Sequence, residues 1–224
     1  HGKITRDSSG VSVDRSAYLV AQRCYQVDSH KGQISVRSVS CVPPGAKPCA
    51  AKAWRISAGK DFPQTAKASL RIDIENAKKL DSSSLHSSIE RNGTAYHMAV
   101  RVPGSTLSKG EDGLWSFAFE LELPASFQLN FGFGETEEDA IRSCIDMESK
   151  ALPLDLPMPE RNLKYLEDVS LMLLEDSVQA DGAHTYVGGF QTYEGAVWVR
   201  DSVFCALCLL RLGDSVLAGK VLSY

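Results

Sequence analysis

Apolar residues recur at every second position through much of the first part of this 224-residue chain. In 69–75, leucine and isoleucine alternate with charged residues, and 34–39 shows a weaker alternation. The segments 115–123 and 127–133 each carry aromatic residues and leucines on one face, and the short sequence Pro-Ala-Ser lies between them. This period is typical of half-buried strands. We expect about eight strands in an antiparallel β-sandwich, with 115–123 and 127–133 paired as a hairpin.

The period becomes helical after this region. Thr136 precedes acidic residues and is expected to cap a helix whose apolar positions include Cys144 and Ile145. The sequence "PLDLPMPE" follows, and its three prolines break regular structure. We therefore expect a β-sandwich domain at 1–134 and a linker, composed of this helix and the proline-rich segment, at 135–160.

Helical spacing returns at 161–224, first in an amphipathic helix that begins near Leu163. The irregular sequence "QADGAHTYVGGFQTYEGA" then leads to an apolar helix that ends at Gly213, and Asp214 is expected to cap the next helix. These two helices predict an αα-hairpin. Because the hairpin has no polar closing face, we expect the first helices of a larger array, truncated at the end of this sequence. The residues expected to face inward are Val203, Ala206, Leu207 and Leu210 in the first helix and Val216, Leu217 and Val221 in the second.

Composition narrows the class of protein. Hydrophobic residues make up 43% of the chain, and the formal net charge of −4 creates no field that attracts nucleic acid or an anionic membrane. No apolar run approaches the roughly 20 residues of a membrane-spanning helix. Six cysteines are too few for a disulfide scaffold, which favours a cytoplasmic protein, with a secreted protein that has lost its leader as the alternative. Cys205 and Cys208 are expected to be small core residues, so no metal is predicted there.

Candidate chemistry gathers where the irregular loop meets the apolar helix. Tyr193, Trp198, Arg200 and Asp201 lie there, and their side chains could converge at one rim. Aromatic faces pack against pyranose rings, and charged groups bind sugar hydroxyls, so this set fits a sugar site. The alternative is structural, since Asp201 in a first helical turn is stabilised by the helix dipole and could pair with Arg200.

The run "YEGAVWVRDSVFCALCLLRLGD" resembles the first hairpin of six-hairpin glycosidases, in particular the glucoamylase and glucodextranase group. The resemblance covers about 30 residues directly and about 65 with the preceding helix. It implies that 161–224 begins an (α/α)6 helical barrel after the sandwich and the linker helix. It also implies that Trp198, Arg200 and Asp201 bind the terminal sugar of an oligo- or polysaccharide substrate, with Tyr193 lining the same rim.

The resemblance places the catalytic acid and base of an inverting glycosidase on later hairpins, so no catalytic residue is assigned. It implies a glucoamylase-like hydrolase of α-linked glucosides, whose fragment in this sequence is inactive alone. Such a hydrolase needs no cofactor, and none is predicted. Two alternatives remain open: a non-catalytic carbohydrate-binding or assembly module, and a debranching enzyme or phosphorylase on the same barrel.

Other signals are weaker. His1 with His86 or His97 could form a copper site like that of lytic polysaccharide monooxygenases, but the helical last third does not fit those all-β enzymes. His184 is expected to be solvated, and the sequon at Asn92 to be a hairpin turn. The serine-rich sequence "DSSSLHSSIERNG" is expected to be a surface loop.

Overall fold

The computed structural model describes residues 11–43, 49–61, 63–91, 93–176 and 199–223. The chain divides into two compact units, His1–Met158 and Pro159–Tyr224. The first is built mainly of antiparallel strands, and the second contains three described helices.

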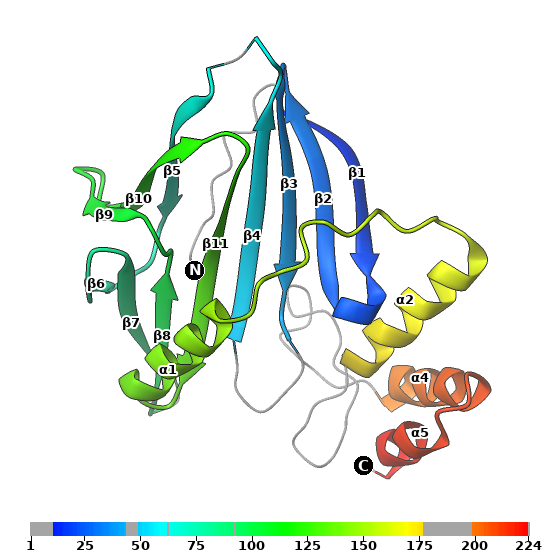
Figure 1. Cartoon of the computed structure of the whole chain (residues 1–224). Helices are drawn as coiled ribbons and strands as arrows, with labels where there is room; N and C mark the ends of the chain where they lie inside the picture. The colour runs from blue at the N-terminus through cyan, green and yellow to red at the C-terminus, as the bar shows by residue number, and fades with distance from the viewer. Residues whose placement is uncertain (1–10, 44–48, 62, 92, 177–198, 224) are drawn as a thin grey trace. The chain divides into compact units, whose positions relative to one another are not determined.

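The larger sheet of the first unit has eight strands in the order β1-β2-β3-β4-β11-β8-β7-β6, with neighbours antiparallel (Figure 1). A second sheet has three strands in the order β5-β10-β9. The strands are β1 (Ser12–Leu19), β2 (Cys24–Lys31), β3 (Ile34–Cys41), β4 (Cys49–Ala58), β5 (Thr65–Ile72), β6 (Lys78–Lys79), β7 (Ser84–Arg91), β8 (Thr94–Arg101), β9 (Thr106–Lys109), β10 (Trp115–Glu122) and β11 (Ala125–Gly134).

An apolar core joins the two sheets. Phe117 of β10 and Leu85 of β7 are fully buried in it, and Trp54 of β4 packs against its edge. Phe119 from the smaller sheet meets Phe127 from the larger, with ring centroids 4.7 Å apart. The predicted antiparallel, sandwich-like arrangement is therefore present.

The predicted hairpin of 115–123 with 127–133 is wrong. The first segment is β10, which pairs with β5 and β9, and the second is β11, which pairs with β4 and β8. The short link between them therefore crosses from one sheet to the other. Alternation shows which face of a strand is buried but not which strand lies beside it, and two sheets facing one core bury both aromatic rows equally well.

The serine-rich sequence predicted as a surface loop instead contains strand β7. Leu85 points into the sandwich core, and His86 and Ser87 are only 6% and 2% exposed. The Ser87 hydroxyl donates to the Glu75 carbonyl at 2.6 Å. Small hydroxyl side chains can be buried at little cost when a backbone carbonyl accepts their hydrogen bond, so a polar composition did not prevent burial.

Helix α1 (Glu137–Glu148) packs on the outer face of β11 and β8. Thr136 caps it as predicted, because its hydroxyl oxygen accepts from the Asp139 amide at 3.1 Å. Cys144 is buried as predicted, but Ile145 is 51% exposed. The buried row consists of Ala140, Cys144 and Met147, which are spaced four and three residues apart, so Ile145 lies around the helix from it.

Residues 149–158, which we call the strap, leave α1 and cross the outer face of β4, β3 and β2 (Figure 1). Leu154 is buried against the sheet, and Leu152 and Leu156 pack beside it. Arg37 of β3 donates to the carbonyls of Leu154 and Leu156 at 3.1 and 3.2 Å. The strap thus belongs to the first unit, which it joins by apolar packing and by polar contacts that include the Arg37 guanidinium.

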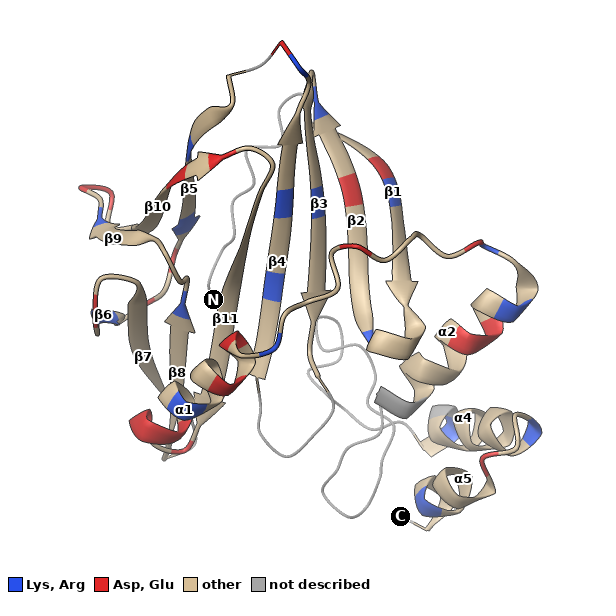
Figure 2. Cartoon of the chain, in the orientation of Figure 1, with Lys and Arg blue, Asp and Glu red and all other residues tan. Residues whose placement is uncertain are grey.

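The second unit contains α2 (Leu163–Asp176), α4 (Val199–Arg211) and α5 (Ser215–Leu222). Asn162 caps α2, since its side-chain oxygen accepts from the Tyr165 amide at 2.9 Å. Lys164 pairs with Asp168, one turn later on α2, at 2.7 Å, and Figure 2 marks basic and acidic positions on this helix.

Candidate functional site

The hairpin of α4 and α5 contains Arg200 and Asp201, two of the four predicted sugar-site residues. Gly213 ends α4 with a φ of +93°, and its amide donates to the Leu210 carbonyl at 3.2 Å. The Asp214 carboxylate accepts from the Leu217 amide at 2.9 Å and caps α5. Both roles were predicted, because glycine adopts a left-handed conformation easily and aspartate is a preferred N-cap.

The buried face of the hairpin differs in part from the predicted one. Ala206 and Leu209 of α4 and Ala218 and Val221 of α5 form its core. Predicted inward positions Val203, Leu207 and Leu210 are instead 39, 50 and 45% exposed, and Val216 is 70% exposed. The reason is that α4 is apolar around much of its circumference, so sequence spacing cannot tell which apolar stripe the neighbouring helices cover.

Of the four predicted sugar-site residues, the structure places two. Arg200 lies in the first turn of α4 and its side chain is exposed, and Asp201 follows it in the helix. Tyr193 and Trp198 lie outside the described residues, as do His184 and Asn92. The first turn of α4 therefore carries an exposed basic side chain.

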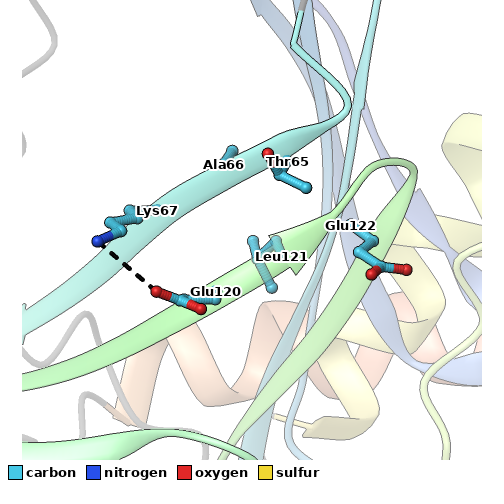
Figure 3. Close-up of a pocket in the computed structure, with 6 residues that line it drawn as sticks. All are labelled: Thr65, Ala66, Lys67, Glu120, Leu121 and Glu122. Atoms are coloured by element: carbon cyan, nitrogen blue, oxygen red, sulfur yellow. Dashed lines mark ion pairs between the residues drawn. The ribbon is translucent and has the colours of Figure 1, made fainter.

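A hollow of about 440 Å³ lies on the outer side of β5 and β10 (Figure 3). Lys67 and Glu120 pair across it at 3.6 Å, and Leu121 and Glu122 line it further along β10. Both charged side chains are more than 80% exposed. An ion pair in such open surroundings is screened by water, and the described residues that line the hollow include no aromatic ring to hold a sugar. The chemistry does not indicate a catalytic site.

A second hollow, of about 430 Å³, lies over β1 to β4. Arg37 lines this hollow and donates two hydrogen bonds to the Asp28 carboxylate, from Nε to Oδ1 at 2.9 Å and from Nη2 to Oδ2 at 3.1 Å. Arg55 of β4 pairs with Asp155 of the strap nearby. Both guanidinium groups bind carboxylates, and both contact the strap, which indicates a structural role.

His86 and His97 of neighbouring strands form a stacked pair. Their rings are 5.2 Å apart, and Nε2 of His86 lies 3.0 Å from Nδ1 of His97. The Glu137 carboxylate at the start of α1 is 3.5 Å from the other nitrogen of His86. Burial lowers the pKa of His86, Glu137 opposes this shift, and His97 and Lys78 add to it.

The copper-site hypothesis receives no support from this pair. His1 lies outside the described residues, and within the described part of the chain no three histidine, cysteine or acidic side chains are grouped so that they could hold a metal ion. Leu85, Ser87 and Ile89 alternate with more polar residues, a pattern that predicts a strand containing His86. The serine-rich composition of the segment favoured a loop instead, so the sequence analysis missed this strand.

Among the helices in the described ranges, none is both long and apolar enough to cross a bilayer. Figure 2 shows acidic and basic residues interspersed along the strands and helices.

Comparisons with known proteins give one informative result. No family model matches the sequence, and no curated protein matches it. Among solved structures, the chain is similar to a bacterial glucoamylase whose crystal structure was determined in complex with acarbose, with a TM-score of 0.66 and 12% sequence identity. The match covers 97% of this chain and 41% of the glucoamylase chain, so this sequence spans about two fifths of that protein. At this identity the likeness concerns the fold, and the fold of this chain is similar to that of the corresponding part of a bacterial glucoamylase.

Proposed function

We propose that this chain is part of a glucoamylase-like, inverting glycoside hydrolase that acts on α-linked glucosides. The observation that carries the proposal is the similarity of fold to a bacterial glucoamylase over almost the whole chain. Independent support comes from the sequence resemblance of 193–214 to the first hairpin of six-hairpin glycosidases. Coordinates and residue pattern thus lead to the same class of protein by different routes.

The sugar subsite of this proposal lies at the start of α4. Arg200 and Asp201 bind hydroxyls of the terminal glucosyl unit, and Trp198 and Tyr193 provide the aromatic faces that pack against the ring. The exposure of the Arg200 side chain in the first turn of α4 supports the assignment, because solvent and a ligand can reach it.

The helices continue into an (α/α)6 barrel in the whole protein. Support comes from the apolar side chains that α4 and α5 leave exposed, among them Phe204 at 62% and Val216 at 70%. Further helical hairpins would bury these faces. The general acid and base, which inverting enzymes hold about 6.5–9.5 Å apart, belong to those later hairpins, so the 224-residue chain alone releases no sugar.

The test measures glucose release from maltooligosaccharides by the full-length natural protein. Arg200→Ala and Asp201→Asn should each reduce kcat/KM by about 100-fold, since each removes charge-assisted bonds to the substrate. Arg211→Ala, at the other end of the same helix, is the matched control and should retain activity. Wild-type protein that binds maltooligosaccharides without releasing glucose would favour the carbohydrate-binding module instead. Release of glucose 1-phosphate with inorganic phosphate would favour a phosphorylase on the same barrel.

A further inference from the structure

Two cysteines face each other at the end of the β2–β3 ladder. Cys24 begins β2, Cys41 ends β3, and the two are direct partners in the register. Directly opposed residues of antiparallel strands have Cα atoms about 4.5–5.5 Å apart, which lies within the range of about 4.4–6.8 Å that a disulfide spans. Both sulfurs also approach the same carbonyl oxygen, that of Gln22, at 3.2 and 3.8 Å. The backbone therefore holds two free thiols where a disulfide could join them.

We propose that Cys24 and Cys41 are a redox modification site, converted to a cross-strand disulfide by exchange with a small-molecule disulfide. This inference is independent of the glycosidase proposal, because it concerns only the β unit.

The surroundings assign different roles to the two sulfurs. A hydrogen bond between the two thiols lowers the pKa of Cys41 despite burial, and the nearby Lys150 ammonium lowers it further. The same hydrogen bond, together with burial, raises the pKa of Cys24. The Cys41 thiolate is therefore the better nucleophile.

The exchange is balanced in two steps. The Cys41 thiolate attacks one sulfur of the small disulfide, forms a mixed disulfide and expels one small thiolate. Cys24 then loses its proton and attacks the Cys41 sulfur, which expels the second small thiolate. Two protein thiols are oxidised to one disulfide, and one small disulfide is reduced to two thiols that carry away the two protons.

The other buried cysteines are less suited to form a disulfide with Cys24 or Cys41. Cys41 pairs with Ala51 in the β3–β4 register, so Cys49 is a diagonal neighbour at about 7–8 Å, beyond easy disulfide reach. Burial raises the pKa of Cys144 on α1 to about 12, so it carries little thiolate. The expected linkage is therefore specific to Cys24 and Cys41.

Access to the pair depends on the strap. Cys24 and Cys41 are only 2 and 7% exposed and share an apolar cluster with Leu154. The strap lacks regular secondary structure apart from turns, and Arg37 holds two of its carbonyls. Local opening of such a segment costs less than opening a sheet, so lifting of the strap is the expected route for the oxidant.

The experiment treats the reduced 224-residue chain with glutathione disulfide and follows it by intact mass and by peptide mapping without reduction. The expected product has lost two hydrogen atoms and contains a peptide pair joined through Cys24 and Cys41. Cys24→Ser should instead accumulate a glutathione adduct at Cys41. Arg37→Gln should accelerate oxidation of the pair by about tenfold, because the strap opens more often.

Two results would overturn the proposal. One is a native chain in which exposed Cys208 becomes glutathionylated while Cys24 and Cys41 remain reduced at equilibrium. The other is a map in which either cysteine is joined to Cys49 or Cys144. Because the mapping uses the unmodified chain, failure of a variant to fold leaves the test intact, and glucose release from the full-length protein bears on the hydrolase proposal alone.

Discussion

At the scale of a single residue, the surroundings of His86 determine how readily it is protonated. This residue of β7 is nearly buried, with His97, Glu137 and Lys78 as its ionisable neighbours. Its ring nitrogens are directed at His97 and Glu137, and in the pair with His97 one nitrogen must donate and the other accept. Burial, together with the neighbouring His97 and Lys78, lowers the pKa of His86 and so opposes its protonation in the folded chain.

The pKa of His86 gives stability a defined pH dependence. Because burial holds this pKa below the ordinary value of 6.5, the unfolded chain gains the proton before the folded chain does. The contribution of neutral His86 to the free energy of unfolding should be complete above about pH 6.5. It should decrease as the pH falls from there to the pKa of His86 in the folded chain. Urea midpoints of unfolding between about pH 7.5 and 5.5 measure the effect. His86→Gln should flatten this slope, whereas His30→Gln, at an exposed pair with Asp14, should retain it. Equal slopes in wild type and His86→Gln would disprove the assignment.

At the scale of elements, the contact between β11 and α1 depends on the absence of a side chain. A Cβ atom at Gly132 would collide with the backbone oxygen of Ala140 and the backbone nitrogen of Cys144, and would lie 2.8 Å from the Cys144 Cα. These are backbone atoms in the middle of a helix and cannot move alone. Gly132 thus lets α1 approach the sheet closely enough to bury Ala140 and Met147.

Gly132→Ala should therefore destabilise the β unit. We expect a loss of about 1–3 kcal/mol or more, the range of overpacked cores, because the whole helix must shift. Ser126→Ala is the matched control on the same strand, since Ser126 is exposed, and should change stability by less than about 0.5 kcal/mol. Urea unfolding, followed by the fluorescence of the sandwich tryptophans, distinguishes the two. A Gly132→Ala protein as stable as wild type would show that α1 lies farther from β11 than described.

At the scale of the whole molecule, the described helices of the second unit expose many large apolar side chains. Exposed large apolar side chains on α4 include Val199, Val203, Phe204, Leu207 and Leu210. Exposed contiguous apolar surface is a common cause of association.

The 224-residue chain should consequently self-associate through α4. Val203→Glu combined with Leu207→Glu should weaken association at least tenfold, because each carboxylate would be desolvated in an apolar contact. Sedimentation velocity over a concentration series provides the measurement. Arg211→Glu, which changes charge at an exposed position of the same helix, should have a smaller effect. Monomeric wild-type chain at every concentration would contradict this expectation.

Several features could be read directly from local sequence. The Thr136 and Asp214 caps and the Gly213 helix end depend on residues within one turn of each other. The pairing of Cys24 with Cys41 was also accessible, because a tight turn at Gly32 fixes every later pair of the β2–β3 hairpin. The sugar-site residues around Arg200 stay a prediction, since only their resemblance to a known hairpin identifies them.

By itself, the sequence determined which segments are strands and helices over most of the chain, because alternation and helix caps act between near neighbours. Tertiary structure alone decided that β10 and β11 belong to different sheets, that the serine-rich segment contains the partly buried strand β7, and that Leu209 faces inward instead of Leu207. Each of these outcomes depends on which surfaces meet. An apolar face can pack against many other apolar faces, so its sequence does not specify its partner. Packing between distant segments therefore selects among arrangements that the local pattern allows equally.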